Sequence, residues 1–350
     1  MDIMLEVAGT IVTQMQKPTL AFLIGGMMLA ALGSKLEVPA PVYKFVVMLL
    51  LLKVGLGAGI SVREADLFAL AVPALLAALV GVGIVLIGSG TLARWRGVNP
   101  MDGMATAGLF GAVSASTLAA GMAMLDSAGI TYEGFIGALY PFMDIAALVT
   151  AIVLARMAEA RKATANAGGG TMALGGGGPG RGFDGRIVGT IMRDTFQSAA
   201  ISALLLGLMI GVLARPEAVY ASFYEPLFRG LLSVLMLVMG MEAWSRLSEL
   251  RKVAHAYVLY GITAPLIHGL LGFGAGLIAH HLTGFSAGGV VLLSVMAASS
   301  SDISGPPTMR GALPEANPSS YVGASTGLGT PVAILSIPLW IALADFVIGL

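Results

Sequence analysis

The chain has 350 residues, of which 57% are hydrophobic and 11% charged, and its mean hydropathy is +0.90. These values exclude an ordinary water-soluble domain and are typical of a protein whose helices lie in a membrane. The formal net charge of +0 gives no reason to expect a nucleic-acid partner, and the absence of cysteine excludes disulfides and thiol chemistry.

Ten apolar stretches predict membrane spans, and most hold about the twenty residues that a bilayer requires. The first and the sixth are marginal. No basic segment precedes the first span, so no cleaved signal peptide is expected. We therefore expect an all-α membrane protein with ten transmembrane helices. Their approximate bounds are 16–33, 42–60, 67–92, 102–124, 134–157, 195–213, 226–244, 253–280, 285–309 and 322–348.

The stretch between the fifth and sixth spans is rich in glycine and almost free of large apolar side chains. It covers residues 160–186 and reads ARKATANAGGGTMALGGGGPGRGFDGR. This composition predicts a flexible linker. The linker divides the chain into a first five-helix repeat, residues 1–159, and a second five-helix repeat, residues 187–350.

The basic residues predict the orientation. With the N-terminus outside, most lysines and arginines fall in cytoplasmic loops, and the outer side keeps Lys17, Arg63, Arg215 and Arg229. Because loops rich in Lys and Arg stay in the cytoplasm, we expect both termini outside and the linker cytoplasmic. Lys53 falls within a span, where it should either pair with an acid or extend to an interface.

Two short motifs indicate that the halves are repeats. Residues 112–117 read AVSAST and residues 297–302 read AASSSD, and an offset of 185 residues aligns their serines. The same offset pairs Gly55 with Gly240, at the ends of spans two and seven. Five spans per half force the second half to insert upside down. Inverted repeats of this kind place substrate and ions near the membrane midplane, between the repeats.

The second motif continues into residues 296–308, which read MAASSSDISGPPT inside an apolar span. Pro306 and Pro307 each leave the carbonyl four residues back without its helical partner, and Gly305 adds backbone freedom. The helix should therefore break and release carbonyl oxygens beside Asp302. Such a break is tolerated in a membrane where it is buried in protein or lines a wet cavity, which favours a cation and small-anion site. A proline kink that only shapes packing is the alternative, but it does not require an aspartate.

The first motif lies in residues 108–121, GLFGAVSASTLAAG, where glycines loosen the helix and hydroxyls cluster. If a helix restarts here, its free N–H groups and the positive end of its dipole could hold a small anion. The alternative is packing of small residues, with the hydroxyls bonded to their own helix. The proximity expected for Asp302 favours the anion site.

Few ionisable residues fall within the spans, and each is a candidate because burial in hydrocarbon is costly. Asp302 is the first of these, and Asp144 is the second because Pro141 frees a carbonyl nearby. Asp144 could be a sodium ligand, a group that orients the ligands, or a structural cap. Glu242 lies near the end of a span and should reach water. His255 and His268 are expected to be interior histidines whose hydrogen bonds are satisfied. No Walker-type loop and no metal-enzyme spacing occur, so ATP drive and enzymatic activity are not expected.

Five motifs resemble the cyanobacterial single-component sodium-dependent bicarbonate transporters (SbtA type), and the likeness covers the chain except the linker. They are PTLAFLIGG (18–26), GLFGAVS (108–114), GALYPFMD (137–144), MGMEAWSR (239–246) and ASSSDISGPP (298–307). The resemblance implies a homotrimer in the cytoplasmic (inner) membrane that takes up bicarbonate with sodium, as part of a carbon-concentrating mechanism. It implies a scaffold (gate) domain from spans one, two, six and seven, and a moving core domain from the rest. It also implies a trimeric PII-like regulator that docks from the cytoplasm and responds to adenine nucleotides.

The chemistry of bicarbonate and sodium suits the two motifs, and no cofactor beyond the coupling ion is expected. Serine hydroxyls and helix N–H groups can meet bicarbonate oxygens without a fixed cation, while sodium prefers oxygen ligands. The expected anion site comprises Gly111, Ser114, Ala115, Ser116, Thr117, Ser299, Ser300 and Ser301. The expected sodium site comprises Phe110, Ser114, Asp144, Asp302 and Ile303, with carbonyls of Phe110 and Ile303 as ligands. The expected helix break comprises Gly305, Pro306 and Pro307.

Two departures from the family pattern bear on these expectations. Ala115 stands where the family favours glycine, which alters the anion pocket, and the glycine-rich linker replaces a longer charged segment, which bears on regulator docking. Other functions fit parts of the pattern. They are a carrier of another small anion coupled to protons or sodium, a proton-coupled antiporter using Asp302, a passive channel, and an intramembrane protease using Asp144 and Asp302. The protease is disfavoured because a Ser- and Pro-broken helix fits ion coordination better.

Overall fold

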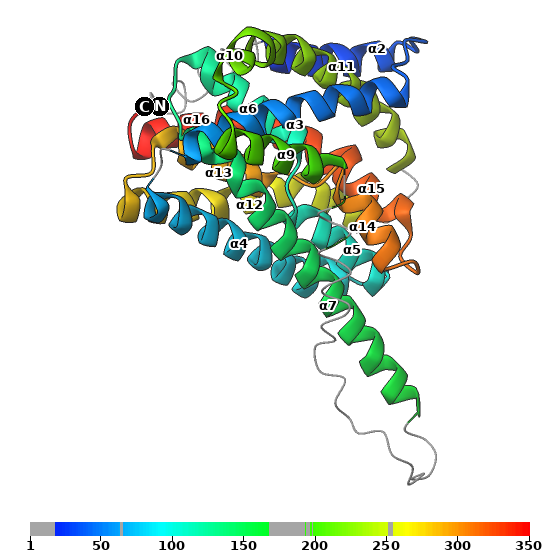
Figure 1. The fold of residues 1–350 in the computed structure, drawn as a ribbon. Helices are drawn as coiled ribbons and strands as arrows, with labels where there is room; N and C mark the ends of the chain where they lie inside the picture. Colours follow the sequence, from blue (N-terminus) through cyan, green and yellow to red (C-terminus); the bar gives the residue numbers. More distant parts are fainter. Residues whose placement is uncertain (1–17, 64–65, 168–192, 194–196, 198, 251–254) are drawn as a thin grey trace.

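Helices form nearly all of the chain that the structure describes, which is residues 18–63, 66–167, 193, 197, 199–250 and 255–350 (Figure 1). In this computed structural model no strand occurs within those residues. Among the described residues, seven helical segments are long and apolar enough to cross a bilayer, and three shorter apolar helices accompany them. The predicted class, an all-α multi-pass membrane protein, is therefore confirmed. The number of ten spans stays a prediction.

Each predicted span of the first half contains helix. The elements are α2 (Pro18–Ala31), α3 (Ala40–Val62), α4 (Leu67–Gly90), η1 (Leu92–Arg94), α5 (Pro100–Gly111), α6 (Ala115–Ala128), η2 (Gly134–Leu139) and α7 (Tyr140–Ala167). Several begin at side-chain caps, because the first N–H groups of a helix have no partner within it. Asp66 accepts a hydrogen bond from the N–H of Phe68, and Asn99 accepts one from that of Met101.

The described residues of the second half are also mainly helical. Its elements are α9 (Ala199–Leu213), α10 (Glu217–Val219), η3 (Tyr220–Tyr224), α11 (Glu225–Leu250), α12 (His255–Thr283), α13 (Ala287–Ala298), α14 (Gly305–Ala312), α15 (Pro318–Ala324), η4 (Ser325–Gly329) and α16 (Thr330–Val347). The segments η3 and η4 are π-helical turns. Ser286 caps α13 through the N–H of Gly289, and Asn317 caps α15 through that of Ser319.

The fifth predicted span runs further than expected. Helix α7 continues to Ala167, so residues 160–167 are helical and do not belong to a linker. The reason lies in their composition, because Ala, Arg and Lys are strong helix formers and the glycine run begins only at Gly168. The rest of the predicted linker, apart from these residues, lies outside the described residues.

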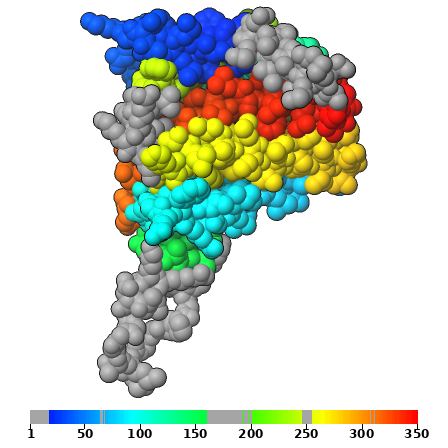
Figure 2. Space-filling view, turned by 180° about the vertical axis from the view of Figure 1, so that it is seen from behind, coloured from blue at the N-terminus to red at the C-terminus, as the bar shows by residue number. Residues whose placement is uncertain are grey.

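Two groups of helices build the bundle. In one group α2 packs on α11 and α3 packs on α9, and these helices lie toward the top of Figure 1. The other group contains α4 to α7 and α12 to α16, in which α4 packs on α5, α7 and α12, and α13 packs on α12 and α16. Figure 2 shows part of this layering from behind, with the blue N-terminal helices above the yellow α12 and the cyan α4.

Glycines set the close approach between α2 and α11. A Cβ placed on Gly26 would lie 2.1 Å from the carbonyl oxygen of Leu237, and one on Gly240 would lie 2.0 Å from that of Leu23. Backbones in membrane bundles pack this closely only where small residues meet. The contact between α3 and α9 is built in the same way, since a Cβ on Gly55 would lie 2.2 Å from the carbonyl oxygen of Leu204.

Gly26→Ala should destabilise the bundle, because the added methyl group must push α11 away from α2. Overpacking of this kind typically costs about 1–3 kcal/mol. Gly25→Ala is the matched control, since nothing lies within 4 Å of a Cβ at Gly25. We expect a lower thermal midpoint in detergent for Gly26→Ala alone. Equal midpoints for the two variants would contradict the packing described here.

Candidate functional site

Both predicted helix breaks are present, and they lie side by side. Helix α5 ends at Gly111 and α6 begins at Ala115, with Ala112 and Ser114 extended between them. Helix α13 ends at Ala298 and α14 begins at Gly305. The structure thus turns each of the two polar motifs into a short connection between half-helices.

The second break differs from the predicted one in its position. Pro306 and Pro307 lie in the first turn of α14 and begin that helix, so they do not interrupt a helix that passes through them. Proline is well placed there because the first N–H groups of a helix have no helical acceptor. Helix α13 has already ended at Ala298, and the hydroxyl of the next residue, Ser299, donates to the carbonyl of Met296 over 2.7 Å.

The two breaks are hydrogen-bonded to each other. The N–H of Ser114 donates to Oγ of Ser299 over 2.9 Å, and the N–H of Ser301 donates to the carbonyl of Leu109 over 2.8 Å. The hydroxyl of Ser116 donates to Oδ2 of Asp302 over 2.5 Å. Predicted anion and sodium ligands from both halves are thereby brought together.

A chain of hydroxyls runs through the first break and ends on a carboxylate. Thr117 donates to Ser114 Oγ over 3.0 Å, and Ser114 Oγ lies 2.8 Å from Ser116 Oγ. Since Ser116 gives its only hydroxyl hydrogen to Asp302, Ser114 must donate to Ser116. All three side chains are at most 1% exposed. Their hydroxyl hydrogens therefore point in one direction, toward Asp302.

A second chain runs the other way and ends on Asp144. Ser301 Oγ lies 3.0 Å from Ser304 Oγ, and Ser304 donates to Oδ2 of Asp144 over 3.1 Å. The other oxygen of Asp144 accepts the N–H of Val113 over 3.1 Å. Ser301 also accepts the N–H of Gly305. Asp144 is fully buried and ties the two breaks together through donors from both.

The two aspartates differ in how many donors they have. Both oxygens of Asp144 accept a hydrogen bond, whereas Oδ1 of Asp302 is buried and has no hydrogen-bond partner among the described residues. No hydrogen bond joins the two carboxylates within that part of the chain, which gives no support to a protease dyad. A buried carboxylate oxygen without a donor is costly, and a cation can relieve that cost.

The remaining predicted residues lie around this centre with other contacts. Ser300 turns away from the first break, donates to the carbonyl of Ser325 over 3.0 Å and lies 3.1 Å from Thr330 Oγ1. The ring of Phe110 packs edge-on against those of Tyr260 and His268. Gly111 lies against neighbouring helices, since a Cβ there would be 2.9 Å from that of Ala147. Ile303 and Ala115 lie in the second connection and at the start of α6, respectively.

Sequence reasoning missed several polar residues beside the breaks. Ser304 and Tyr140 lie in the contacts of Asp144, and their hydroxyls are 3.4 Å apart. Thr330 donates to the carbonyl of Ser300, and Thr326 Oγ1 in the π-helical η4 is buried without a hydrogen-bond partner among the described residues. Ser304 could have been found from its place between Asp302 and the prolines. Nothing in the sequence marks the π-helical turn.

Three expectations about ionisable side chains were wrong. His268 is interior, but its Nδ1 lacks a hydrogen-bond partner among the described residues, and His255 is exposed at the first residue of α12. Lys53 is buried and forms no ion pair in the described chain, so the expected pairing with an acid does not occur there. Glu242 is partly buried. No cluster of three or more His, Cys, Asp or Glu occurs among the residues searched.

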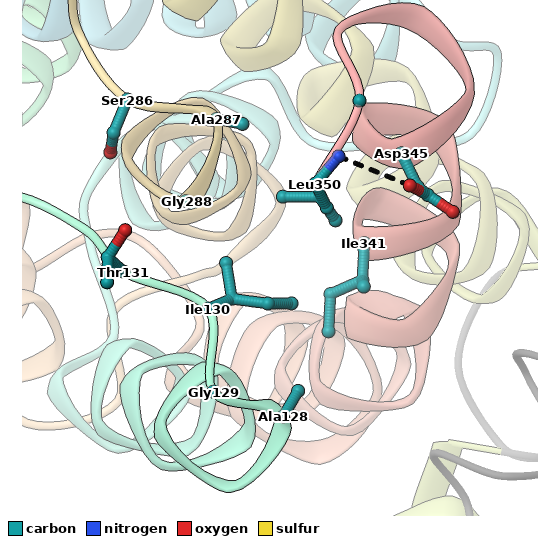
Figure 3. Close-up of a pocket in the computed structure, with 11 residues that line it drawn as sticks. Ala128, Gly129, Ile130, Thr131, Ser286, Ala287, Gly288, Ile341, Asp345 and Leu350 are labelled. Atoms are coloured by element: carbon teal, nitrogen blue, oxygen red, sulfur yellow. Dashed lines mark hydrogen bonds between the residues drawn. The ribbon is translucent and has the colours of Figure 1, made fainter.

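A surface cavity lies elsewhere in the structure. A cavity of about 610 Å³ lies between the ends of α6 and α16 and the start of α13, where Thr131, Ser286 and Asp345 line it (Figure 3). None of its described lining residues belongs to either break. The candidate site is therefore a set of buried, mutually bonded polar groups and not a wide surface pocket.

Comparison with known proteins identifies a family. A family model described as the Na+-dependent bicarbonate transporter superfamily matches residues 18–345, which include both breaks. The match confirms the resemblance seen in the five motifs. A comparison with curated proteins finds no match.

Asp144→Ala should lower thermal stability, because it leaves the buried N–H of Val113 and the hydroxyl of Ser304 without their acceptor. Each buried donor without an acceptor typically costs about 1–3 kcal/mol. Asp345→Ala is the control, since Asp345 is exposed and accepts only the N–H of Leu350 among the bonds of its side chain in the described residues. The measurement is thermal unfolding in detergent. A midpoint for Asp144→Ala equal to that of the control would show that Asp144 does not hold the breaks.

Proposed function

The chain belongs to the Na+-dependent bicarbonate transporter superfamily, and we propose that it is a symporter that carries bicarbonate inward with sodium by alternating access. The observation that carries the proposal concerns Oδ1 of Asp302, which is buried and has no hydrogen-bond partner among the described residues. It lies between two broken helices that are hydrogen-bonded to each other. Broken helices at a repeat interface are how secondary transporters hold an ion and an anion together.

Sodium is proposed to bind at Oδ1 of Asp302. This oxygen has a negative charge and no donor among the described residues, which is the condition under which a hard cation gains most. The carbonyls of Phe110 and Ile303, Ser114 and Asp144 remain the proposed further ligands. Asp144 is the weaker candidate among them because both of its oxygens already accept hydrogen bonds.

Bicarbonate is proposed to bind at the start of α6. The N–H of Thr117 is already bonded to Ser114 Oγ over 3.1 Å, so the first-turn N–H groups of Ala115 and Ser116 are the ones available to an anion. Gly111, Ser299 and the hydroxyls of Ser114 and Thr117 complete the proposed pocket on the side of the first break. Ser300 and Ser301 remain in the proposal, although their hydroxyls are bonded to other residues and the N–H of Ser301 already donates to the carbonyl of Leu109.

The hydroxyl chain supplies a physical reason for coupling. Without sodium the hydroxyl hydrogens of Thr117, Ser114 and Ser116 point along the chain toward Asp302. The hydroxyl oxygens therefore present lone pairs, and not hydrogens, to an incoming anion. Sodium at Oδ1 of Asp302 neutralises the carboxylate and thereby weakens the hydrogen bond that Ser116 donates to Oδ2. The hydroxyl of Ser116 can then rotate and donate to bicarbonate, so each ligand favours the other.

The glycine contacts support an inverted repeat. The offset of 185 residues maps Gly26 onto Gly211 and Gly55 onto Gly240. It thereby exchanges the contact between α2 and α11, where Gly26 and Gly240 lie, with the contact between α9 and α3, where Gly211 and Gly55 lie. We infer two repeats, residues 1–159 and 187–350, with α2, α3, α9 and α11 as the scaffold domain and the other helices as the moving core domain.

Further parts of the proposal rest on the family alone. They are the cytoplasmic (inner) membrane with both termini outside, a homotrimer, a role in a carbon-concentrating mechanism, and a cytoplasmic PII-like regulator that responds to adenine nucleotides. The intervening segment, residues 168–186, would face the cytoplasm.

Proteoliposomes holding the purified protein should take up radiolabelled bicarbonate when an inward sodium gradient is imposed. Replacing sodium with potassium should reduce uptake to that of empty vesicles, because the carboxylate of Asp302 then stays uncompensated. Equal uptake in both salts would reject sodium coupling and leave a proton-coupled carrier or a channel. Sodium-driven uptake of another small anion in place of bicarbonate would show that this anion is the substrate.

Asp302→Asn should reduce sodium-stimulated uptake at least about tenfold, which corresponds to about 1.4 kcal/mol of lost interaction. The amide keeps the size of the side chain but removes the charge that binds sodium. Both the half-saturating sodium concentration and the half-saturating bicarbonate concentration should rise. Asp345→Asn, which changes an exposed carboxylate far along α16, should behave as the wild type. Sodium-stimulated uptake that survives in Asp302→Asn would remove Asp302 from the sodium site.

A further inference from the structure

Lys53 is an unusual residue of α3 that the proposed transport site does not use. It lies two and a half turns before the end of the helix at Val62, roughly 14 Å along the axis. Its side chain is 7% exposed, and its Nζ lies 4.3 Å from the centre of the Phe228 ring and 5.7 Å from that of Tyr220. A charged side chain at such a depth is costly and generally functional.

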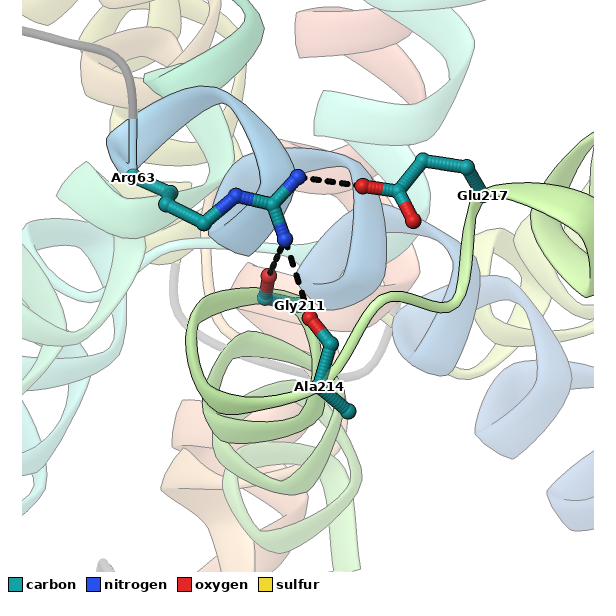
Figure 4. A network of polar contacts seen from close by, with 4 residues as sticks. All are labelled: Arg63, Gly211, Ala214 and Glu217. Atoms are coloured by element: carbon teal, nitrogen blue, oxygen red, sulfur yellow. Dashed lines mark hydrogen bonds and ion pairs between the residues drawn. The ribbon is translucent and has the colours of Figure 1, made fainter.

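The charge of Lys53 is left without a carboxylate. No acid lies within ion-pair distance of it in the described chain. Arg63, at the end of the same helix, shows the contrast, since it donates to the carbonyls of Gly211 and Ala214 over 3.3 and 2.9 Å and pairs with Glu217 (Figure 4). Arg63 therefore serves to join α3 to α9, whereas two aromatic rings only partly compensate the ammonium of Lys53.

The ammonium lines a cavity of about 450 Å³ between α3, α6 and α11. Basic and acidic side chains share its lining, namely Lys53, Arg229, Asp126 and Glu225, together with residues 129–132 and Phe228. Lys53 is the buried one of these charged residues, and the other three are exposed. Positive charge is therefore the charge found at depth, and the acids lie at the rim.

The neighbouring cavity, shown in Figure 3, has the opposite character. It shares residues 129–131 with the cavity of Lys53, but Asp345 lines it and none of its described lining residues is basic. In the predicted orientation both cavities lie at the outer ends of the helices. A small anion that approaches the outer face would thus favour the cavity of Lys53.

We propose that this cavity is an outer vestibule for the transported anion and that Lys53 is its inner binding group, which holds a small monoanion before it reaches the broken helices. The proposal rests on the proposed function, in which that anion is bicarbonate. Burial in a low-dielectric setting strengthens the attraction of the ammonium, and the aromatic faces hold it in place without neutralising it. The acids at the rim keep the attraction weak enough for the anion to move on, as conduction requires.

The cavity of Lys53 also lies close to the helices that carry the candidate site. Helix α3 packs on η2, and a Cβ on Gly137 of η2 would lie 2.5 Å from Cγ1 of Val54, the residue next to Lys53. Segment η2 leads directly into α7, which carries Asp144. The cavity of Lys53 thus lies along the boundary between α3 and α11 on one side and the helices of the candidate site on the other.

The experiment compares initial rates of sodium-driven bicarbonate uptake in proteoliposomes over a range of bicarbonate concentrations. Lys53→Met keeps the apolar stem but removes the charge, and Lys53→Arg keeps the charge. Lys53→Met should raise the half-saturating bicarbonate concentration about five- to tenfold, while the half-saturating sodium concentration stays within twofold. Lys53→Arg should recover most of the loss. Lys44→Met is the control, since Lys44 is an exposed lysine of the same helix.

Because the chain has no cysteine, Lys53→Cys offers a second test in a background without other thiols. A methanethiosulfonate reagent with an aminoethyl group attaches a new ammonium there and should restore uptake. One with a sulfonatoethyl group attaches an anion and should reduce uptake further. Protection of the cysteine from both reagents would show that the cavity does not open to the solution.

The outcomes separate this proposal from the one it rests on. Wild-type protein without sodium-driven uptake overturns the proposed function and the vestibule with it. Active wild type with normal bicarbonate saturation in Lys53→Met overturns the vestibule alone. An equal fall of the maximal rate in Lys53→Met and Lys53→Arg, at unchanged half-saturation, would also overturn it, because it would make Lys53 a packing residue.

Discussion

The hydrogen bonds between two interrupted helices are the constraint on which the rest of this structure depends. Each break exposes backbone groups that hydrocarbon cannot satisfy, and two of these groups find their partners across the two breaks. The N–H of Ser114 meets the hydroxyl of Ser299, and the N–H of Ser301 meets the carbonyl of Leu109. Neither half-helix pair could keep this conformation alone. The two halves of the chain therefore have to pack together before either polar motif is stable.

The same arrangement gives the carboxylates of the two aspartates different hydrogen-bond partners. Each ends a chain of serine hydroxyls that begins in the opposite half, Asp302 after Ser116 and Asp144 after Ser304. Asp144 also accepts a backbone N–H, so both of its oxygens accept hydrogen bonds, whereas Oδ1 of Asp302 accepts none from the described residues. A fully bonded carboxylate suits a structural joint, and a partly bonded one suits a ligand that comes and goes. The difference arises from a single backbone donor, the N–H of Val113.

The sequence predicts the helices and the two breaks because both follow from local chemistry. Hydropathy marks the apolar segments, and Gly305, Pro306 and Pro307 mark an interruption. Details that depend on packing are not predictable in this way. The prolines begin α14 and do not break a helix within it, because their effect depends on where α13 ends. The Nδ1 of His268 has no hydrogen-bond partner among the described residues, and η4 is π-helical. Both features likewise depend on neighbours that are distant in sequence.

Lys53 shows why a residue of this kind escapes sequence reasoning. A lone lysine in an apolar helix predicts either an ion pair or an extended side chain, since both are common solutions for a single charge. The structure adopts a third, in which the rings of Phe228 and Tyr220, far along the chain, hold the ammonium beside a cavity.

Helices α2, α3, α9 and α11 pack through glycine and backbone contacts that leave little room for movement. The breaks instead meet through hydroxyls that can exchange partners. The structure thus holds α2, α3, α9 and α11 together through close backbone contacts and joins the two breaks through side-chain hydroxyls.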